Sequence, residues 1–84
     1  MQAKDIIQLT VLSPEKTVLQ ANVSKVVLPA TKGQFMVLYN HAPVITSLEE
    51  GKVVYETQGR LESIEIYGGF AEVNENVVTI CAEV

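Results

Sequence analysis

Apolar and polar residues alternate along most of this chain, in short stretches that turn-forming residues separate. The stretch 7–11, Ile-Gln-Leu-Thr-Val, has the two-residue period of a strand with one buried face. Valine and other β-branched residues recur throughout, and they pack well on a pleated sheet. No stretch has the spacing and end caps of a long helix. We predict strands at 7–11, 17–20, 23–28, 35–38, 44–48, 52–56, 61–67, 70–73 and 77–82.

Turn-forming residues mark the ends of these strands. The segment 13–16, Ser-Pro-Glu-Lys, ends the first strand, because proline presets the backbone of a turn and serine can bond back to it. Pro29 is expected to end the third strand. Gly59 is expected to be the left-handed residue of a hairpin. Gly68 and Gly69 predict a sharp bend or bulge before the next strand.

Several predicted strands, such as 26–28 and 77–78, are apolar on both faces. A single sheet would leave one of these faces in water, so a second sheet or a partner must cover it. We therefore predict an all-β fold, a sandwich or flattened barrel of short, mostly antiparallel strands. The length of 84 residues fits one domain over 1–84.

Composition narrows the function. Ten acidic and six basic residues give a net charge of -4, and the basic residues form no run, so neither nucleic acid nor anionic lipid is an expected partner. The single cysteine, Cys81, excludes an internal disulfide and is expected to be a small buried hydrophobic residue. The sequence has no membrane-span-length apolar run and no signal-peptide pattern. These features predict a small soluble domain of a reducing compartment, without direct membrane insertion.

Residues that could carry catalysis are sparse. His41 is the only histidine, and its sequence neighbours offer neither an acid nor a nucleophile. The acidic residues are spread over strands and turns, and Gly68-Gly69 lacks the Lys-Ser or Lys-Thr of a phosphate loop. We therefore expect no enzyme, no metal site and no cofactor. A small enzyme that uses His41, with Cys81 as a conceivable partner, is one alternative.

A second alternative is a carrier domain of the lipoyl or biotinyl type, which presents a modifiable lysine at a hairpin tip. Lys52 follows Gly51, but its flanking residues do not suit such a domain, and Lys32 is expected in a longer loop. This alternative is a small β-rich binding or carrier module of another class.

The segment 34–43 is the least ordinary part of the chain, because it combines aromatic residues, a methionine and the lone histidine. One interpretation is a strand and its turn, with Phe35 and Val37 in the core and His41 capping the turn. The other is a partner-binding loop, since loops on a rigid β scaffold often carry function and interfaces are enriched in aromatic residues and Met.

A set of motifs, in this order and spacing, resembles the N-terminal β domain of the ε subunit of F-type ATP synthase over nearly the whole chain. The motifs are Leu12-Ser13-Pro14-Glu15-Lys16, Val26-Val27-Leu28-Pro29, Gly33-Gln34-Phe35, His41-Ala42-Pro43, Gly68-Gly69-Phe70 and Glu72-Val73. The resemblance implies a flattened β-sandwich of about ten strands. It also implies a non-catalytic subunit of the rotating central stalk, which couples c-ring rotation to the γ subunit and the catalytic head. The complex would lie on the cytoplasmic face of a bacterial inner membrane, or on an organelle membrane.

The resemblance also implies which residues meet these partners. The contact with γ falls on Ser13 and Pro14. The contact with the c-ring falls on two loops of one rim, formed by Gly33, Gln34 and Phe35 and by Asn40, His41, Ala42 and Pro43.

The chain departs from the family pattern at three of its positions. Gln34 stands where the family usually has Glu, which would remove a charged contact with the ring. Met36 stands where Gly is usual, which suggests a different local backbone or a larger apolar contact. Tyr39 stands where Pro is common.

Family members usually continue from the last strand into a two-helix hairpin that can bind ATP and inhibit ATP hydrolysis. This sequence stops at Val84, where the hairpin would begin. From the resemblance we expect a naturally short subunit or a truncated form, with no helical hairpin and no ATP binding in these 84 residues.

Overall fold

The computed structural model describes residues 5–84, which form nine β-strands and no α-helix. Over the same residues, no helix has the length and apolar character that a membrane crossing requires. The strands are β1 (Ile7–Leu12), β2 (Thr17–Val23), β3 (Lys25–Ala30), β4 (Gly33–Val37), β5 (Val44–Leu48), β6 (Gly51–Thr57), β7 (Arg60–Ile66), β8 (Gly68–Asn74) and β9 (Val77–Glu83).

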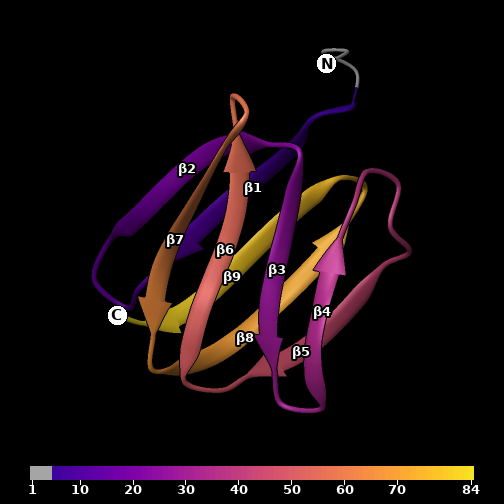
Figure 1. Ribbon diagram of the computed structural model, residues 1–84. Helices are drawn as coiled ribbons and strands as arrows, with labels where there is room; N and C mark the ends of the chain where they lie inside the picture. Colours follow the sequence, from indigo (N-terminus) through magenta and orange to yellow (C-terminus); the bar gives the residue numbers. More distant parts are fainter. Residues whose placement is uncertain (1–4) are drawn as a thin grey trace.

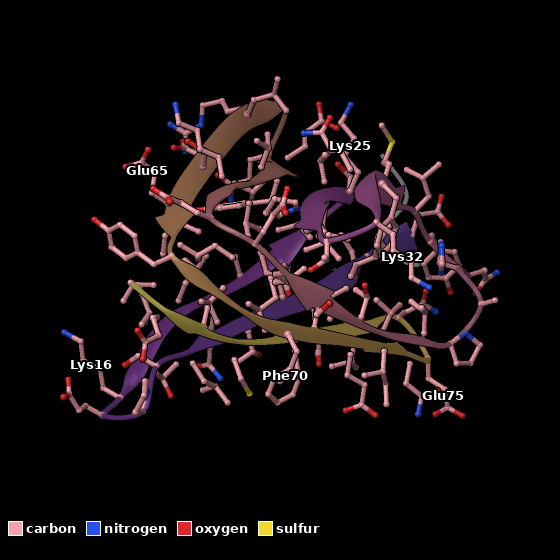
Figure 2. The ribbon with its side chains drawn as sticks, turned by 90° about the horizontal axis from the view of Figure 1, so that it is seen from below. Lys16, Lys25, Lys32, Glu65, Phe70 and Glu75 are labelled. Atoms are coloured by element: carbon pink, nitrogen blue, oxygen red, sulfur yellow. The ribbon has the colours of Figure 1, made fainter. Side chains whose placement is uncertain are left out.

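The strands form two layers that face each other (Figures 1 and 2). The first layer has the order β2-β1-β9-β8-β5, and the second has the order β7-β6-β3-β4. The two layers are joined at a single rung, where Ala30 of β3 pairs with Leu48 of β5. All pairs are antiparallel except β1 with β9. The predicted all-β sandwich is confirmed, with nine strands in the described chain where the resemblance implied about ten.

The core lies between the layers and is apolar throughout. In β1, Ile7, Leu9 and Val11 are fully buried and alternate with more exposed residues, as the sequence pattern predicts. No polar or charged residue among 5–84 is buried. Burying this surface is the main stabilising contribution, at about 25 cal/mol per Å² of apolar area removed from water.

Two of the four crossings between the layers are made by a single residue each. Ser24 lies between β2 and β3, and its N–H donates to the carbonyl of Glu56 at 2.8 Å while its hydroxyl donates to the Glu56 carboxylate at 2.7 Å. Tyr67 lies between β7 and β8, and its N–H donates to the carbonyl of Glu83 at 2.8 Å. These bonds satisfy backbone groups where the strand ladders are interrupted. The prediction that Val23 begins the third strand is wrong, because Val23 is the buried last residue of β2.

The prediction that Pro29 ends the third strand is also wrong. Pro29 lies within β3, paired with Gln34 of β4. Its carbonyl accepts a bond from the N–H of Glu49 at 3.0 Å, so its nitrogen faces the side on which pairing with β6 has already ended at Val27. The missing N–H of proline therefore costs no ladder bond here.

The structure has turns at the predicted positions 13–16 and 59. The Ser13 side chain accepts from the N–H of Lys16 at 3.3 Å, and the Ser13 N–H donates to the Lys16 carbonyl at 2.9 Å, which closes the turn between β1 and β2. Gly59 has a φ of 78°, as the predicted hairpin requires. Glu75 and Asn76 both have positive φ, which is the pattern of a type I′ turn between β8 and β9.

Gly69 has a φ of 147° and lies opposite Ala82 of β9. A Cβ atom at this position would collide with the carbonyl oxygen of Cys81 and crowd the Cα of Ala82. Only glycine allows β8 to approach β9 this closely directly after the crossing at Tyr67. The predicted bend at Gly68-Gly69 is thus the start of β8 itself.

We predict that Gly69→Ala lowers the free energy of unfolding by about 3 kcal/mol or more, because it adds a backbone collision to an unfavourable φ. Gly33→Ala is the matched control, since Gly33 has a φ of 130° but open space around the added methyl. The control should lose only about 1 kcal/mol of strain. Urea unfolding followed by circular dichroism measures both, and equal losses would contradict the close-approach argument.

Candidate functional sites

The first candidate surface is an open edge where the two layers meet, which we call the β4–β5 edge. It consists of Gly33–Val37, the connecting loop 38–43 and Val44–Leu48 (Figure 1). β4 pairs only with β3, and β5 meets β3 at one rung, so these two strands leave a groove of about 580 Å³ between them. Gln34, Phe35 and the exposed Ile45 are among the residues that line it.

The loop 38–43 starts with a tight turn. The N–H of His41 donates to the carbonyl of Leu38 at 3.1 Å, and Asn40 has a φ of 66°, the arrangement of a type II turn. The rings of His41 and Phe35 lie side by side, with centroids 6.0 Å apart. Val37 is buried, and Phe35 is half-buried against the core. The core position of Val37 is therefore confirmed and that of Phe35 in part, whereas the bond that closes the turn comes from the backbone of His41 and not from its side chain.

The residues that the resemblance assigns to the c-ring lie along the β4–β5 edge, in two groups. Gly33, Gln34 and Phe35 are the first residues of β4, so the predicted strand 35–38 begins two residues earlier than expected and ends one residue earlier, and the loop implied at Gly33 and Gln34 is wrong. They belong to a strand because they pair with Ala30, Pro29 and Leu28. The second group, Asn40, His41, Ala42 and Pro43, follows the other end of β4. A five-residue strand places the two ends about 13 Å apart.

The family pattern, which usually has Gly at position 36, left open whether Met36 changes the local backbone or enlarges an apolar contact. The Met36 backbone is ordinary extended strand, since its φ is not positive, and its side chain is 47% exposed. It pairs with Val27, which pairs in turn with Val54. Met36 therefore extends an apolar row on the outer face of the second layer and leaves the backbone of β4 regular.

The second candidate surface is a groove on the outer face of the first layer, which we call the outer groove. It has a volume of about 370 Å³ and is predominantly apolar. Strand register places Leu12, Cys81 and Phe70 next to one another on β1, β9 and β8. The β1–β2 turn closes one side. The lining residues are Leu12, Ser13, Pro14, Gly68, Gly69, Phe70, Cys81, Ala82 and Glu83.

The outer groove contains both residues that the resemblance assigns to γ, Ser13 and Pro14, together with residues that sequence reasoning missed. Phe70 is 52% exposed and points away from the core (Figure 2). The alternation in β8, where Ala71 and Val73 are buried, could have predicted this direction. The prediction that Cys81 is buried is wrong, because Ile80 and Ala82 take the inward positions of β9 and turn Cys81 to the outer face.

The two surfaces meet where Phe70 of the outer groove pairs with Ser47 of the β4–β5 edge, and from there they extend toward different ends of the domain. In Figure 2, Lys16 of the β1–β2 turn and Lys32 of the β3–β4 turn lie far apart on opposite sides of the view. The outer groove borders the first of these turns, and the β4–β5 edge begins at the second. One domain can therefore contact two partners at the same time.

Neither surface has the geometry of a catalytic site. The His41 ring faces the carbonyl of Ala42, with Nδ1 2.6 Å from the oxygen, and no carboxylate bonds to it. The adjacent Asn40 bonds to Asn76, which precedes β9, whereas Cys81 lies about 16 Å further along that strand. A Cys81–His41 pair therefore does not form. Within residues 5–84, no three His, Cys, Asp or Glu side chains gather as potential metal ligands.

The carrier alternative requires a lysine at a hairpin tip, and the structure shows where its two candidate lysines lie. Lys52 lies within β6, opposite Glu65 of β7, and not at a hairpin tip. Lys32 lies in the two-residue turn between β3 and β4, so the expectation of a longer loop is wrong. The other residue of this turn is Thr31.

Comparison with known proteins gives a consistent result. The family model described as the ATP synthase delta/epsilon chain β-sandwich domain matches residues 6–84. The ATP synthase epsilon chain of Desulfitobacterium hafniense is 47% identical over 75 residues, covering 89% of this chain and 57% of the relative. That of Nostoc punctiforme is 49% identical over 72 residues, covering 83% and 53%. The chain thus spans about half the length of the curated relatives it matches.

A solved structure has the same fold. A chain in the Euglena gracilis mitochondrial ATP synthase structure, described as OSCP/F1/c-ring in rotational state 1, superposes with a TM-score of 0.87 and 30% identity. The match covers 93% of this chain and 51% of that one. Together with the two-layer fold and the motif order, these matches show that this chain belongs to the ATP synthase delta/epsilon chain β-sandwich family.

Proposed function

We infer that this domain is a non-catalytic rotor component of an F-type ATP synthase, which holds the γ subunit and the c-ring together so that ring rotation reaches the catalytic head. The observation that carries the proposal is the presence of two distinct grooves on one rigid sandwich, the outer groove and the groove of the β4–β5 edge. Its family membership supports the assignment to this complex. The domain would work as part of a peripheral membrane complex, on the cytoplasmic face of a bacterial inner membrane.

The outer groove suits the γ subunit. Phe70, Leu12 and Pro14 present apolar surface next to the partly covered Cys81, and stable interfaces bury such an apolar centre inside a polar rim. Ser13 and Glu83 supply polar groups at the border of the groove. The aromatic ring of Phe70 is a suitable anchor, because a few large side chains contribute most of the binding free energy in protein interfaces.

The β4–β5 edge suits the c-ring. Gln34 and all of the loop 38–43 except the half-buried His41 are exposed, and they offer polar groups, which fits contact with polar loops at the surface of a membrane ring. Gln34 carries no charge, so this contact depends on shape and hydrogen bonding more than on ion pairs. Transmission of torque requires both contacts to persist while the ring rotates, and the stiff β layers between them meet that requirement.

The carrier and enzyme alternatives have no comparable support. Lys32 sits in a tight turn, but its flanking residues, Thr31 and Gly33, lack the acidic or methionine residues expected beside a modified lysine. Membership of the delta/epsilon family favours a role in the ATP synthase complex.

We predict that Phe70→Asp weakens binding to γ by at least about 30-fold, because it places a charge at the centre of an apolar contact. Leu61→Asp is the matched control, since Leu61 is 64% exposed on the second layer. Both variants should melt within a few degrees of the wild type, because neither side chain is in the core. Isothermal titration with purified γ measures the affinities, and a loss confined to Leu61→Asp would place γ on the other layer.

We predict that the double variant Gln34→Ala/His41→Ala lowers the affinity of the γ-bound chain for the purified c-ring by roughly tenfold, through the loss of two contact side chains. Ser63→Ala, an exposed change on β7, is the control. Surface plasmon resonance on immobilised rings measures both. Equal affinity of the double variant and the control would remove the β4–β5 edge from the ring interface.

A further inference from the structure

Two turns from distant parts of the sequence meet at one end of the sandwich. The loop 38–43 crosses from β4 in the second layer to β5 in the first, and the turn at Glu75 and Asn76 joins β8 to β9. Residues 40 and 76 are 36 positions apart in the chain, yet they share a pair of side-chain hydrogen bonds.

The two asparagines bond reciprocally. The backbone N–H of Asn40 donates to Oδ1 of Asn76 at 2.6 Å, and Nδ2 of Asn76 donates to Oδ1 of Asn40 at 3.2 Å. The backbone carbonyl of Asn76 also accepts from the N–H of Gln8 at 2.9 Å, next to the start of β1. Asn76 therefore connects the loop 38–43, the β8–β9 turn and β1.

Asparagine is well suited to both positions. Asn40 and Asn76 have φ values of 66° and 64°, a left-handed conformation that Asn tolerates better than other non-glycine residues. The amide group supplies both an acceptor and a donor, whereas an aspartate would supply acceptors only. Asn76 is half-buried, while its turn neighbour Glu75 is exposed and bonds to neither asparagine.

The Asn40 backbone is held at the midpoint of the loop that carries His41, Ala42 and Pro43. Apart from the Asn76 bonds, the tip of this loop is held by its own turn bond from His41 to Leu38 and by the contact between the His41 and Phe35 rings. The turn bond is local and restrains only the shape of the tip. The Asn76 bonds are the ones that fix the tip against the first layer.

We propose that Asn76 is a positioning residue for the loop 38–43, which it holds in the orientation that contacts the c-ring. This proposal rests on the proposed function of that loop. A loop that is already fixed loses less conformational entropy on binding, so removing the bonds should weaken binding although Asn76 lies outside the residues assigned to the ring contact.

The first experiment measures the restraint itself, in the 84-residue chain without partners. Asn76→Gly keeps the left-handed turn but removes both side-chain bonds, and Asn76→Asp keeps the acceptor for the Asn40 N–H. Glu75→Gly is the matched control, because it introduces glycine at the neighbouring position of the same turn, where the φ is also positive at 50°. We expect amide hydrogen exchange at Asn40, followed by NMR, to be roughly tenfold faster in Asn76→Gly. Asn76→Asp and Glu75→Gly should stay near the wild-type rate.

An unchanged Asn40 exchange rate in Asn76→Gly would overturn the proposal. Equal acceleration in Glu75→Gly would overturn it as well, because the effect would then belong to the turn backbone and not to the side chain.

The second experiment measures binding of the same variants, in complex with γ, to the purified c-ring. We expect Asn76→Gly to lose roughly fivefold in affinity, and Asn76→Asp to retain most of it. If Asn76→Gly frees the loop but binds normally, while Gln34→Ala/His41→Ala binds poorly, the positioning role is overturned. If the double variant also binds normally, the ring-binding function of the β4–β5 edge fails, and the inference fails with it for a distinguishable reason.

Discussion

Every strand of this domain must turn one face toward a single apolar core, and this constraint governs the rest of the structure. With 84 residues the core is thin, and it contains no buried polar side chain in the described part of the chain. Such a core demands that the chain cross between layers without leaving buried backbone groups unpaired. The crossings at Ser24 and Tyr67 meet this demand with one residue each, and Gly69 lets β8 lie against β9 directly after the second.

The same constraint explains why the two candidate surfaces carry apolar residues. Once the inward positions of β1, β8 and β9 are filled, Leu12, Phe70 and Cys81 are left on the outside, in register with one another. The layers do not close at β4 and β5, and that opening creates the groove and the exposed loop of the β4–β5 edge. Both surfaces are thus by-products of the sandwich, available for partners because folding does not use them.

Much of the fold could be predicted from local pattern. The alternation in 7–11, the turn at Ser13 and the left-handed Gly59 are each decided by neighbouring residues, and each was predicted correctly. The direction of Cys81 was mispredicted because the prediction relied on the usual burial of cysteine, although Thr79 and Glu83, two residues to either side, mark its face of β9 as the outer one. The end of the third strand was mispredicted at Pro29, because the effect of a proline in a sheet depends on which neighbouring strand its nitrogen faces.

The candidate sites were less predictable than the fold. Sequence motifs indicated Ser13, Pro14 and the segment 33–43, but the grouping of Phe70 with the β1–β2 turn depends on strand order. The contact between Asn40 and Asn76 joins residues that no local pattern connects. Long-range pairings of this kind follow from topology, and they become visible only when the two layers are in place.

The central claim is that one rigid sandwich touches γ and the c-ring through different surfaces. A photo-crosslinking amino acid placed at position 70 or at position 34 of the chain, within the assembled ATP synthase, tests this claim most directly. The account predicts that the probe at position 70 crosslinks to γ and the probe at position 34 crosslinks to the c subunit. Crosslinks from both probes to the same partner, or an exchange of the two partners, would contradict it.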